Sequence, residues 1–373
     1  MIRLILLIIL FLLSLLAVFR AQAYYLWLMA VVVTEYPLIL VGLTAMLTLA
    51  GIWVVPYRLS GNIIGIVAMF IYLSPIVRAY VVARNVNEDM KHAFTNAILP
   101  VNISPFSFMG LFKPGHTVSF KTVNYAQYPN KNLSLDYYMS QVVEKQPCVI
   151  VVHGGSWSSG DSQQLPELNS SLATKGFNVA AINYRMAPKY QTPAPVEDVE
   201  NAINYLCRHA DELNIDTNKF VLLGRSAGAQ IALLAAYTLH DERIKGVIDF
   251  YGPADMVWGY SIPTSPLVMD SRKVMRDYIG GSYEQVPAKF AACSPLEFVD
   301  KRSVPTLIIH GENDVLVSPE HSRRLNLKLQ QNGIPHYYLN LPWAVHGFDY
   351  NLNGPGGQLS TYTVEAFLYT VTK

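Results

Sequence analysis

The sequence predicts an α/β domain with a mostly parallel central sheet flanked by helices, preceded by apolar helical segments. From about residue 117, short apolar runs alternate with longer stretches of helical periodicity. The apolar runs carry hydrophobic side chains at successive positions, which is typical of strands buried on both faces in a sheet covered by helices. Before residue 85, long uncharged tracts dominate instead.

The predicted elements of the α/β part follow a regular order. An opening pair of strands at 117–126 and 133–139 is separated by the turn residues Pro129-Asn130-Lys131-Asn132 and is expected to form a hairpin. Further strands are expected at 148–152, 178–183, 220–223, 247–250, 306–309 and 337–341. Helices are expected at 195–213, 228–240, 319–332 and 358–372.

Three apolar tracts occupy the N-terminal part, at residues 4–19, 37–55 and 63–77. Each approaches the roughly 17–25 residues that a helix needs to cross a bilayer, and none shows the polar face of a helix in a soluble bundle. We therefore expect about three transmembrane helices and a multi-pass membrane protein. A cleaved signal peptide is the alternative for the first tract, since Ala21-Gln22-Ala23 follows it. The side of the membrane that holds the α/β domain stays open.

The change in composition divides the chain into three parts. We expect membrane segments at 1–84, a linker at 85–116 and the α/β domain at 117–373. Within that domain, residues 253–300 are rich in methionine and aromatic side chains. They are expected to form either a cap over an apolar pocket or an ordinary helical connection.

Charge and cysteine content exclude several classes of protein. The net charge of +1 comes without a basic stripe, so nucleic acid is not an expected partner. The 3 cysteines are too few and too isolated for a disulfide framework or a zinc site. No H-E-x-x-H run or clustered histidine and aspartate spacing occurs, so we expect no metal and no cofactor.

The most informative motif is Gly224-Arg225-Ser226-Ala227-Gly228, a G-x-S-x-G run. An apolar strand pattern leads into it and a helical pattern leaves it, which is the context of a nucleophile elbow. Such a turn holds its serine in a strained backbone conformation, and only small neighbours fit around it. We therefore expect Ser226 to be a nucleophile.

A serine hydroxyl reacts only with help from a base, an orienting carboxylate and donors for the developing oxyanion. In this arrangement the acid and then the base follow the serine along the chain, each after a strand. Asp314 lies in the polar loop after the strand at 306–309 and is the expected acid, with Glu312 and Asp255 as competitors. His346 follows the last strand, next to a glycine, and is the expected base.

The loop after the strand at 148–152 reads His153-Gly154-Gly155-Ser156-Trp157. Its glycines let backbone N–H groups turn towards a substrate carbonyl. The expected oxyanion donors are the amides of Gly155, Ser156 and Ala227. His153 is expected to brace this loop, and His310 to support the acid.

Together these residues resemble the α/β-hydrolase fold, and within it the esterases related to hormone-sensitive lipase. His153-Gly154-Gly155 is similar to that group's H-G-G oxyanion motif. Asn183-Tyr184-Arg185-Met186-Ala187-Pro188 is similar to its N-Y-R-x-A-P element. Ser226, Asp314 and His346 match its nucleophile, acid and base, and the resemblance spans about residues 117–373.

Departures from that pattern indicate a neighbouring branch. Arg225 and Ala229 replace the Asp and the last Gly of the G-D-S-A-G-G elbow, and Ser156 replaces a third glycine after H-G-G. These features are closer to feruloyl and acetylxylan esterases, kynurenine formamidases and prenylcysteine methylesterases, the last of which also carry membrane segments. The resemblance implies serine hydrolase chemistry and names no substrate.

The sequence therefore predicts a membrane-anchored serine hydrolase that cleaves carboxylic esters through an acyl-enzyme. Its expected partners are a small-molecule or lipid ester and the bilayer. Hydrolysis of an amide or formamide, or acyl transfer to another acceptor, would use the same residues and remains an alternative. A membrane binding module without catalysis is a further alternative, which the complete set of catalytic residue types disfavours.

Overall fold

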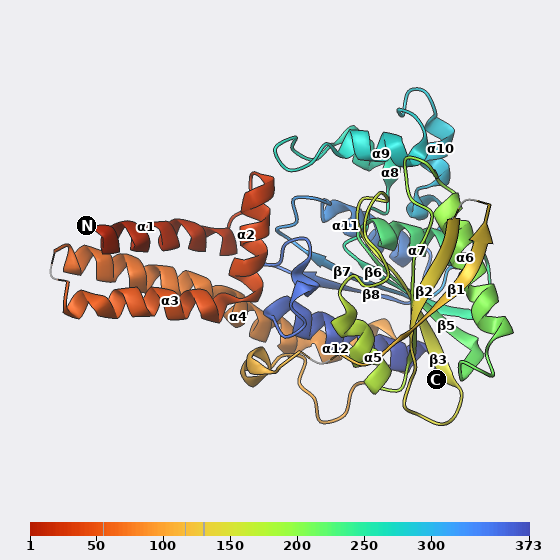
Figure 1. Ribbon diagram of the computed structural model, residues 1–373, viewed down its shortest axis with the longest axis horizontal. Helices are drawn as coiled ribbons and strands as arrows, with labels where there is room; N and C mark the ends of the chain where they lie inside the picture. Colours follow the sequence, from red (N-terminus) through yellow and green to blue (C-terminus); the bar gives the residue numbers. More distant parts are fainter. Residues whose placement is uncertain (55, 116, 130) are drawn as a thin grey trace.

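An eight-stranded sheet forms the centre of the protein (Figure 1). The structure, a computed structural model, describes residues 1–54, 56–115, 117–129 and 131–373. Val55, His116 and Asn130, which belong to the second apolar tract, the expected linker and the expected turn, lie outside this description. The strand order is β1-β2-β4-β3-β5-β6-β7-β8.

The sheet is mostly parallel, as predicted. The strands are β1 (Lys121–Tyr128), β2 (Lys131–Tyr138), β3 (Gln146–Val152), β4 (Asn178–Ile182), β5 (Ile215–Arg225), β6 (Ile244–Phe250), β7 (Thr306–Gly311) and β8 (His336–Leu341). The strands from β3 to β8 run parallel to one another, while β2 pairs antiparallel with both β1 and β4. The expected opening pair of strands is therefore present.

Helices cover both faces of the sheet, because the central strands carry apolar side chains on both faces. In β3, Ile150 and Val152 belong to one core cluster, and Val149 and Val151 to the other. The first cluster packs under α6 (Ala194–Arg208), α7 (Ala227–Thr238) and α11 (Glu320–Gln331). The second packs under α5 (Pro166–Thr174), α12 (Pro355–Val371) and the second half of α4 (Arg58–Ala93). Helix α5 and the packing of the second half of α4 on the sheet were not predicted.

Short helices fill the connection between β6 and β7. They are α8 (Met256–Ser261), α9 (Ser271–Ile279), α10 (Pro287–Ala292) and the 3-10 helix Pro295–Phe298. Figure 1 shows them grouped at the top of the view, beyond α7 and α11. This segment overlaps the expected cap at 253–300, and its part from Pro253 to Met275 lines the cavity described below.

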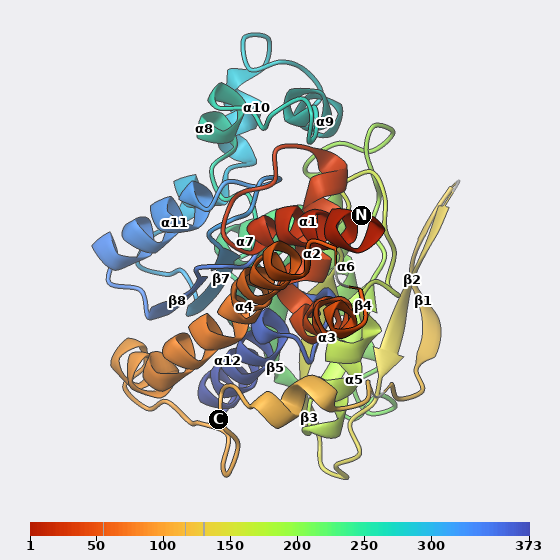
Figure 2. The ribbon, with the colours of Figure 1, turned by 90° about the vertical axis from the view of Figure 1, so that its left-hand side faces the viewer.

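The N-terminal helices form a narrow bundle that projects from the domain (Figures 1 and 2). It consists of α1 (Ile2–Ser14), α3 (Pro37–Leu49) and the first half of α4, while α2 (Tyr24–Glu35) lies across its base. Two buried polar contacts hold the bundle together. The Arg3 guanidinium donates from Nε to the Leu47 carbonyl oxygen at 2.7 Å, and the Tyr72 hydroxyl donates to the Leu10 carbonyl oxygen at 2.6 Å.

The bundle does not support the prediction of three spans. By length and composition, one helix of the described residues, α4, could cross a membrane; a second span is counted only if α2 and α3, bent by 87° at their junction, act as one. The first apolar tract gives only the short apolar helix Ile2–Ala17. Hydropathy located these apolar segments but did not reveal where each helix begins and ends: the third tract, 63–77, is only part of α4 (Arg58–Ala93).

Helix α4 also crosses the expected boundary at residue 84. It continues without interruption to Ala93, so the residues just after 84 are helical. Its second half lies against the domain, where Ile76, Ala79, Val86 and Met90 join the core cluster under α12. The same helix therefore belongs to the projecting bundle at one end and to the α/β domain at the other.

Candidate active site

Ser226 occupies the tight turn between β5 and α7. Its backbone has φ 52° and ψ −120°, a conformation that is strained for any residue with a side chain. A Cβ atom added at Gly224 would collide with the backbone of Gly228 and Ala229. A Cβ atom at Gly228 would collide with the backbone at the end of β3. The small residues around Ser226 are therefore required by the turn, which has the strand, turn and helix of a nucleophile elbow.

Asp314 and His346 meet across two loops that follow β7 and β8. The Nδ1 atom of His346 lies 2.7 Å from Oδ2 of Asp314. The two competing acids point elsewhere: Glu312 pairs with Arg323 at the surface, and Asp255 caps α8 through the Trp258 N–H at 2.9 Å. The carboxylate that contacts His346 is therefore that of Asp314.

The surroundings of Asp314 keep its carboxyl group ionised. Burial by itself would raise the pKa of Asp314, but the neighbouring His346 and His310 rings outweigh this and hold that pKa well below its ordinary value. The Oδ1 atom also accepts hydrogen bonds from the backbone N–H groups of Leu316 and Val317, at 2.8 and 2.9 Å. Because an ionised carboxylate only accepts hydrogen bonds, the proton between it and His346 belongs to Nδ1, and in the neutral form of the ring Nε2 then has a free lone pair.

His310 contacts the acid directly, as expected of a supporting residue. Its Nε2 atom lies 3.1 Å from Oδ2 of Asp314, and its Nδ1 atom lies 2.6 Å from the Ser322 hydroxyl. The ring is completely buried. It therefore contacts Oδ2 of Asp314, whereas the amides of Leu316 and Val317 bind Oδ1.

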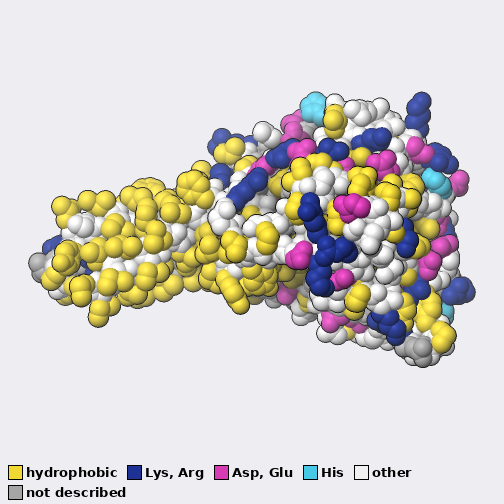
Figure 3. Space-filling model, turned by 90° about the horizontal axis from the view of Figure 1, so that it is seen from above, with side chains coloured by type: hydrophobic (Ala, Val, Ile, Leu, Met, Phe, Trp, Pro, Cys, Tyr) yellow, Lys and Arg dark blue, Asp and Glu magenta, His cyan; other side chains and the backbone are white. Residues whose placement is uncertain are grey.

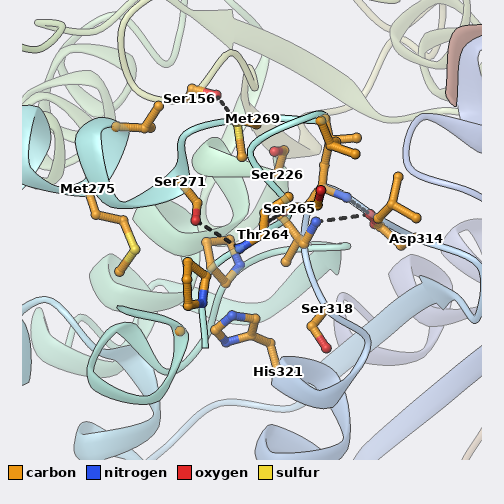
Figure 4. A pocket seen from close by; sticks show the side chains of 18 of the residues that line it. Ser156, Ser226, Thr264, Ser265, Met269, Ser271, Met275, Asp314, Ser318 and His321 are labelled. Carbon is orange, nitrogen blue, oxygen red and sulfur yellow. Dashed lines mark hydrogen bonds between the residues drawn. The ribbon is translucent and has the colours of Figure 1, made fainter. Parts of the chain in front are cut away.

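Two cavities meet at Ser226. One, of about 330 Å³, is lined by Ser226 and His346 together with residues of the loop after β3. The other, of about 310 Å³, lies beside the segment between β6 and β7 and includes Met269 and Met275 (Figure 4). The serine and the histidine thus face one space, although they are 120 positions apart in the sequence (346 − 226).

The loop after β3 has the backbone expected of an oxyanion site. Gly155 and Ser156 adopt positive φ values of 114° and 53°, and both line the cavity that contains Ser226 and His346. Ala227, the third expected donor, is the first residue of α7 and so presents a free N–H of a helix start. The structure thus brings the three residues beside Ser226.

His153 braces this loop. Its ring stacks on Tyr184 at a centroid distance of 4.3 Å, and its Nδ1 atom lies 2.7 Å from the Gly154 carbonyl oxygen. Burial lowers the pKa of His153 to about 4, so the ring is neutral at physiological pH. The contacts of the His153 ring therefore serve to pack and orient the loop.

A buried ion pair that the sequence did not reveal joins the elbow to the histidine loop. Arg225, next to Ser226, donates from Nε to Oδ2 of Asp349 at 2.6 Å, and the Tyr251 hydroxyl donates to Oδ1 at 2.5 Å. The Arg225 and Asp349 side chains are 2% and 1% exposed, so neither charge is hydrated. Arg225 was noticeable in the motif, but nothing in the sequence identified its partner.

A second buried aspartate lies in β6 opposite Gly224 of the elbow strand. Asp249 accepts a hydrogen bond from the Gly252 N–H at 2.7 Å through Oδ1. Burial raises the pKa of Asp249 to about 7, although the nearby His310 opposes this rise. The folded protein therefore holds a proton on Asp249 that the unfolded chain, with an aspartate pKa near 3.9, releases at a lower pH.

This difference predicts a pH dependence of stability. The contribution of Asp249 is fully present below about pH 4 and declines as the pH rises to about 7. Within that window it should fall by about 1 kcal/mol per pH unit. The uncharged isostere in Asp249→Asn should remove this slope, as measured by denaturant unfolding from pH 4 to pH 8. Asp161→Asn, an exposed site, is the control; equal slopes in wild type and Asp249→Asn would contradict the assignment.

The comparisons with known proteins agree with this geometry. The BD-FAE family profile matches residues 135–329, just over half of the 373-residue chain. Esterase LipQ of Mycobacterium tuberculosis is 28% identical over 218 residues, which cover 55% of this chain and 51% of LipQ. A probable isoprenylcysteine alpha-carbonyl methylesterase of Arabidopsis thaliana is 26% identical over 234 residues, covering 57% of this chain and 48% of that protein. The chain spans about half the length of these relatives.

A solved structure shows the same fold. A bacterial heroin esterase superposes with a TM-score of 0.60 at 21% sequence identity, covering 71% of this chain and 88% of that one. The predicted resemblance to esterases of this kind, including methylesterases, is confirmed by these matches. The chain has the α/β-hydrolase fold and belongs to the BD-FAE family.

Proposed function

We propose that this protein is a carboxylic ester hydrolase in which Ser226 is the nucleophile, His346 the base and Asp314 the acid that orients it. The hydrogen bond of 2.7 Å between Asp314 and His346 is the observation that carries the proposal, because it leaves the histidine's other nitrogen free beside the cavity that Ser226 lines. Membership of the BD-FAE family and the esterase names of the relatives support ester hydrolysis.

The residues account for each step of the reaction. His346 Nε2 takes the Ser226 hydroxyl proton as Oγ attacks the ester carbonyl carbon. The amides of Gly155, Ser156 and Ala227 stabilise the negative charge that develops on the carbonyl oxygen. His346 then gives its proton to the departing alcohol, which leaves an acyl group on Ser226. A water molecule, activated by His346, then attacks the acyl group in the same way, which releases the carboxylic acid and restores Ser226.

The proposal includes attachment to a membrane through the N-terminal bundle. Figure 3 shows that the projecting bundle is covered with hydrophobic side chains, of which Leu12, Met46 and Phe70 are 57%, 63% and 71% exposed. Residues 4–19, 36–57 and 59–77 contain no charged side chain. Leaving so large an apolar surface in water is unfavourable, whereas a bilayer would cover it.

Aromatic residues at both ends of the bundle support the same placement. Trp53 and Tyr57, near the turn between α3 and α4, are 78% and 58% exposed, and Tyr25, at the start of α2, is 78% exposed. Tryptophan and tyrosine favour the two interfaces of a bilayer. We accordingly propose that the bilayer surrounds the projecting bundle, with the first half of α4 as a crossing helix, and that the catalytic domain at 117–373 is joined to it by the second half of α4, which packs on the domain, and the residues that follow.

A fluorophosphonate probe tests the activity and the location together. Cells that express the full chain are separated into membrane and soluble fractions, and each fraction is labelled. We expect one labelled protein, retained in membranes after an alkaline wash, with the adduct on Ser226 and no labelling of Ser226→Ala. Absence of labelling of the folded wild-type protein would contradict the serine hydrolase. Labelling confined to the soluble fraction would contradict only the membrane attachment.

A further inference from the structure

Helix α2, at the base of the bundle, reaches the proposed catalytic histidine. The indole N–H of Trp27 donates a hydrogen bond of 2.9 Å to the backbone oxygen of His346. The two rings also pack edge to face, with centroids 6.4 Å apart. Trp27 is 5% exposed, so this contact is shielded from water. The loop that carries His346 therefore rests on a residue from the N-terminal part of the chain.

The segment from Arg20 to Glu35, which contains α2, forms hydrogen bonds with the catalytic domain at both of its ends. The Tyr24 N–H donates to the Leu267 carbonyl oxygen in the segment between β6 and β7, at 3.0 Å. The Arg20 guanidinium donates to the Glu312 carbonyl oxygen in the acid's loop, at 2.7 Å. At the other end of α2, the Glu35 side chain accepts from the Gly356 N–H through Oε2 at 2.9 Å. Helix α2 is thus held against the loops that surround Ser226.

The N-terminal segment also contributes to the walls of both cavities. Tyr24 and Trp27 line the cavity of about 330 Å³ that contains His346. Arg20, Ala21 and Gln22 line the cavity of about 310 Å³ beside the segment between β6 and β7. Ser226 lines both cavities, but His346 lines only that of about 330 Å³, and Val274 and Met275 line only that of about 310 Å³.

The chemistry assigns one half of an ester to each cavity. His346 must give its proton to the departing alcohol, so the alcohol has to lie on the side of Ser226 where His346 is. Of the two cavities, the one of about 330 Å³ is lined by His346 and the other is not. The acyl group then occupies the cavity of about 310 Å³, whose wall includes Val274 and Met275 as well as Val268 and Met269, which border both cavities. Figure 4 labels the two methionines. That wall suits an apolar chain.

We propose that helix α2 forms the alcohol-binding side of the active site and that Trp27 is a positioning residue for His346. The substrate is then an ester of an apolar acyl chain, with its alcohol held against Tyr24 and Trp27 at the base of the membrane bundle. This inference rests on the proposed hydrolase function. It makes a helix outside the matched family region, residues 135–329, a part of the substrate site.

Tyr24→Ala tests the alcohol side, with Tyr25→Ala as its matched control. Tyr25 is the next residue of α2 but is 78% exposed and lines neither cavity. For esters of one acyl group with small and large alcohols, Tyr24→Ala should slow acylation by the large-alcohol ester by about tenfold. Hydrolysis of the isolated acyl-enzyme should keep its rate, because the alcohol has already left.

Trp27→Phe tests positioning, with Trp53→Phe at the far end of the bundle as its matched control. Loss of the indole hydrogen bond should lower the rates of acylation and of acyl-enzyme hydrolysis by about threefold to tenfold each. Both steps need His346, and Trp27 does not line the cavity assigned to the acyl group, so the preference among acyl chains should not change. Trp53→Phe should behave as wild type in both steps.

Several outcomes would overturn the inference while the hydrolase function stands. All four variants are first labelled with the fluorophosphonate, which shows that Ser226 still reacts. If labelled Tyr24→Ala changes acyl-chain preference or the hydrolysis of the acyl-enzyme, the assignment of the two cavities is wrong. If labelled Trp27→Phe keeps both rates, Trp27 does not position His346. Failure of wild-type labelling would instead contradict the proposed function itself.

Discussion

An Asp314→Asn variant is expected to fold normally and to lose about four orders of magnitude in kcat. The reason lies in how the two carboxylate oxygens are used. Oδ1 accepts from two backbone N–H groups, those of Leu316 and Val317, and Oδ2 faces His346 Nδ1. In asparagine the amide oxygen keeps the two backbone bonds, so its NH₂ group points at His346. Nδ1 must then accept, the ring proton moves to Nε2, and Nε2 no longer takes the Ser226 proton.

Glu312→Gln is the matched control for this prediction. Glu312 lies on the same loop, two residues before Asp314, and pairs with Arg323 at the surface. Its replacement should leave kcat within about twofold, as for most surface substitutions. The measurement is kcat for a simple ester, with thermal unfolding of each purified variant as the test of folding. A folded Asp314→Asn protein within tenfold of wild type would contradict the role of Asp314.

Local pattern was sufficient to predict most of the α/β domain. Successive apolar residues such as Val149, Ile150 and Val151 can only be buried if both faces of the strand are covered, and the structure shows helices on both faces. The elbow could also be predicted, because side chains at positions 224 and 228 would collide with the backbone and both positions are therefore glycine. These features depend on neighbours in the sequence or on strict alternation.

Long-range contacts could not be predicted in the same way. Trp27 lies 319 positions from His346, and Arg225 lies 124 positions from Asp349. Tryptophan and arginine occur in many environments, so neither residue type indicates a partner at such a distance. The N-terminal tracts show a related limit. Apolar composition predicted helices at these tracts, but it indicated neither α2 (Tyr24–Glu35) nor the bend of 87° between α2 and α3.

The buried pair of Arg225 and Asp349 leads to a second large effect, a loss of stability of about 3–5 kcal/mol in Asp349→Asn. The substitution keeps the size of the side chain and a carbonyl oxygen for the Tyr251 hydroxyl, but it removes the negative charge that compensates Arg225. Among the described residues, Nη1 and Nη2 of Arg225 have no hydrogen-bond partner, so no second carboxylate is hydrogen-bonded to the guanidinium to replace that of Asp349. Asp300→Asn, which breaks an exposed pair with Arg302, is the control and should change stability little.

The stability of each variant is measured from the denaturant midpoint in detergent at an unchanged slope. Asp349 also joins the loop that carries His346 to Arg225, the residue before Ser226, so Asp349→Asn should lower kcat even where the protein is fully folded.

The double variant Arg225→Met with Asp349→Leu separates the loss of stability from the loss of activity. Replacing both charges by apolar side chains removes the uncompensated charge and should restore most of the stability. The double variant does not restore the hydrogen bonds that Asp349 accepts from Arg225 and Tyr251, so activity should stay low. A midpoint for Asp349→Asn equal to that of wild type would show that the Arg225 charge is compensated by another group.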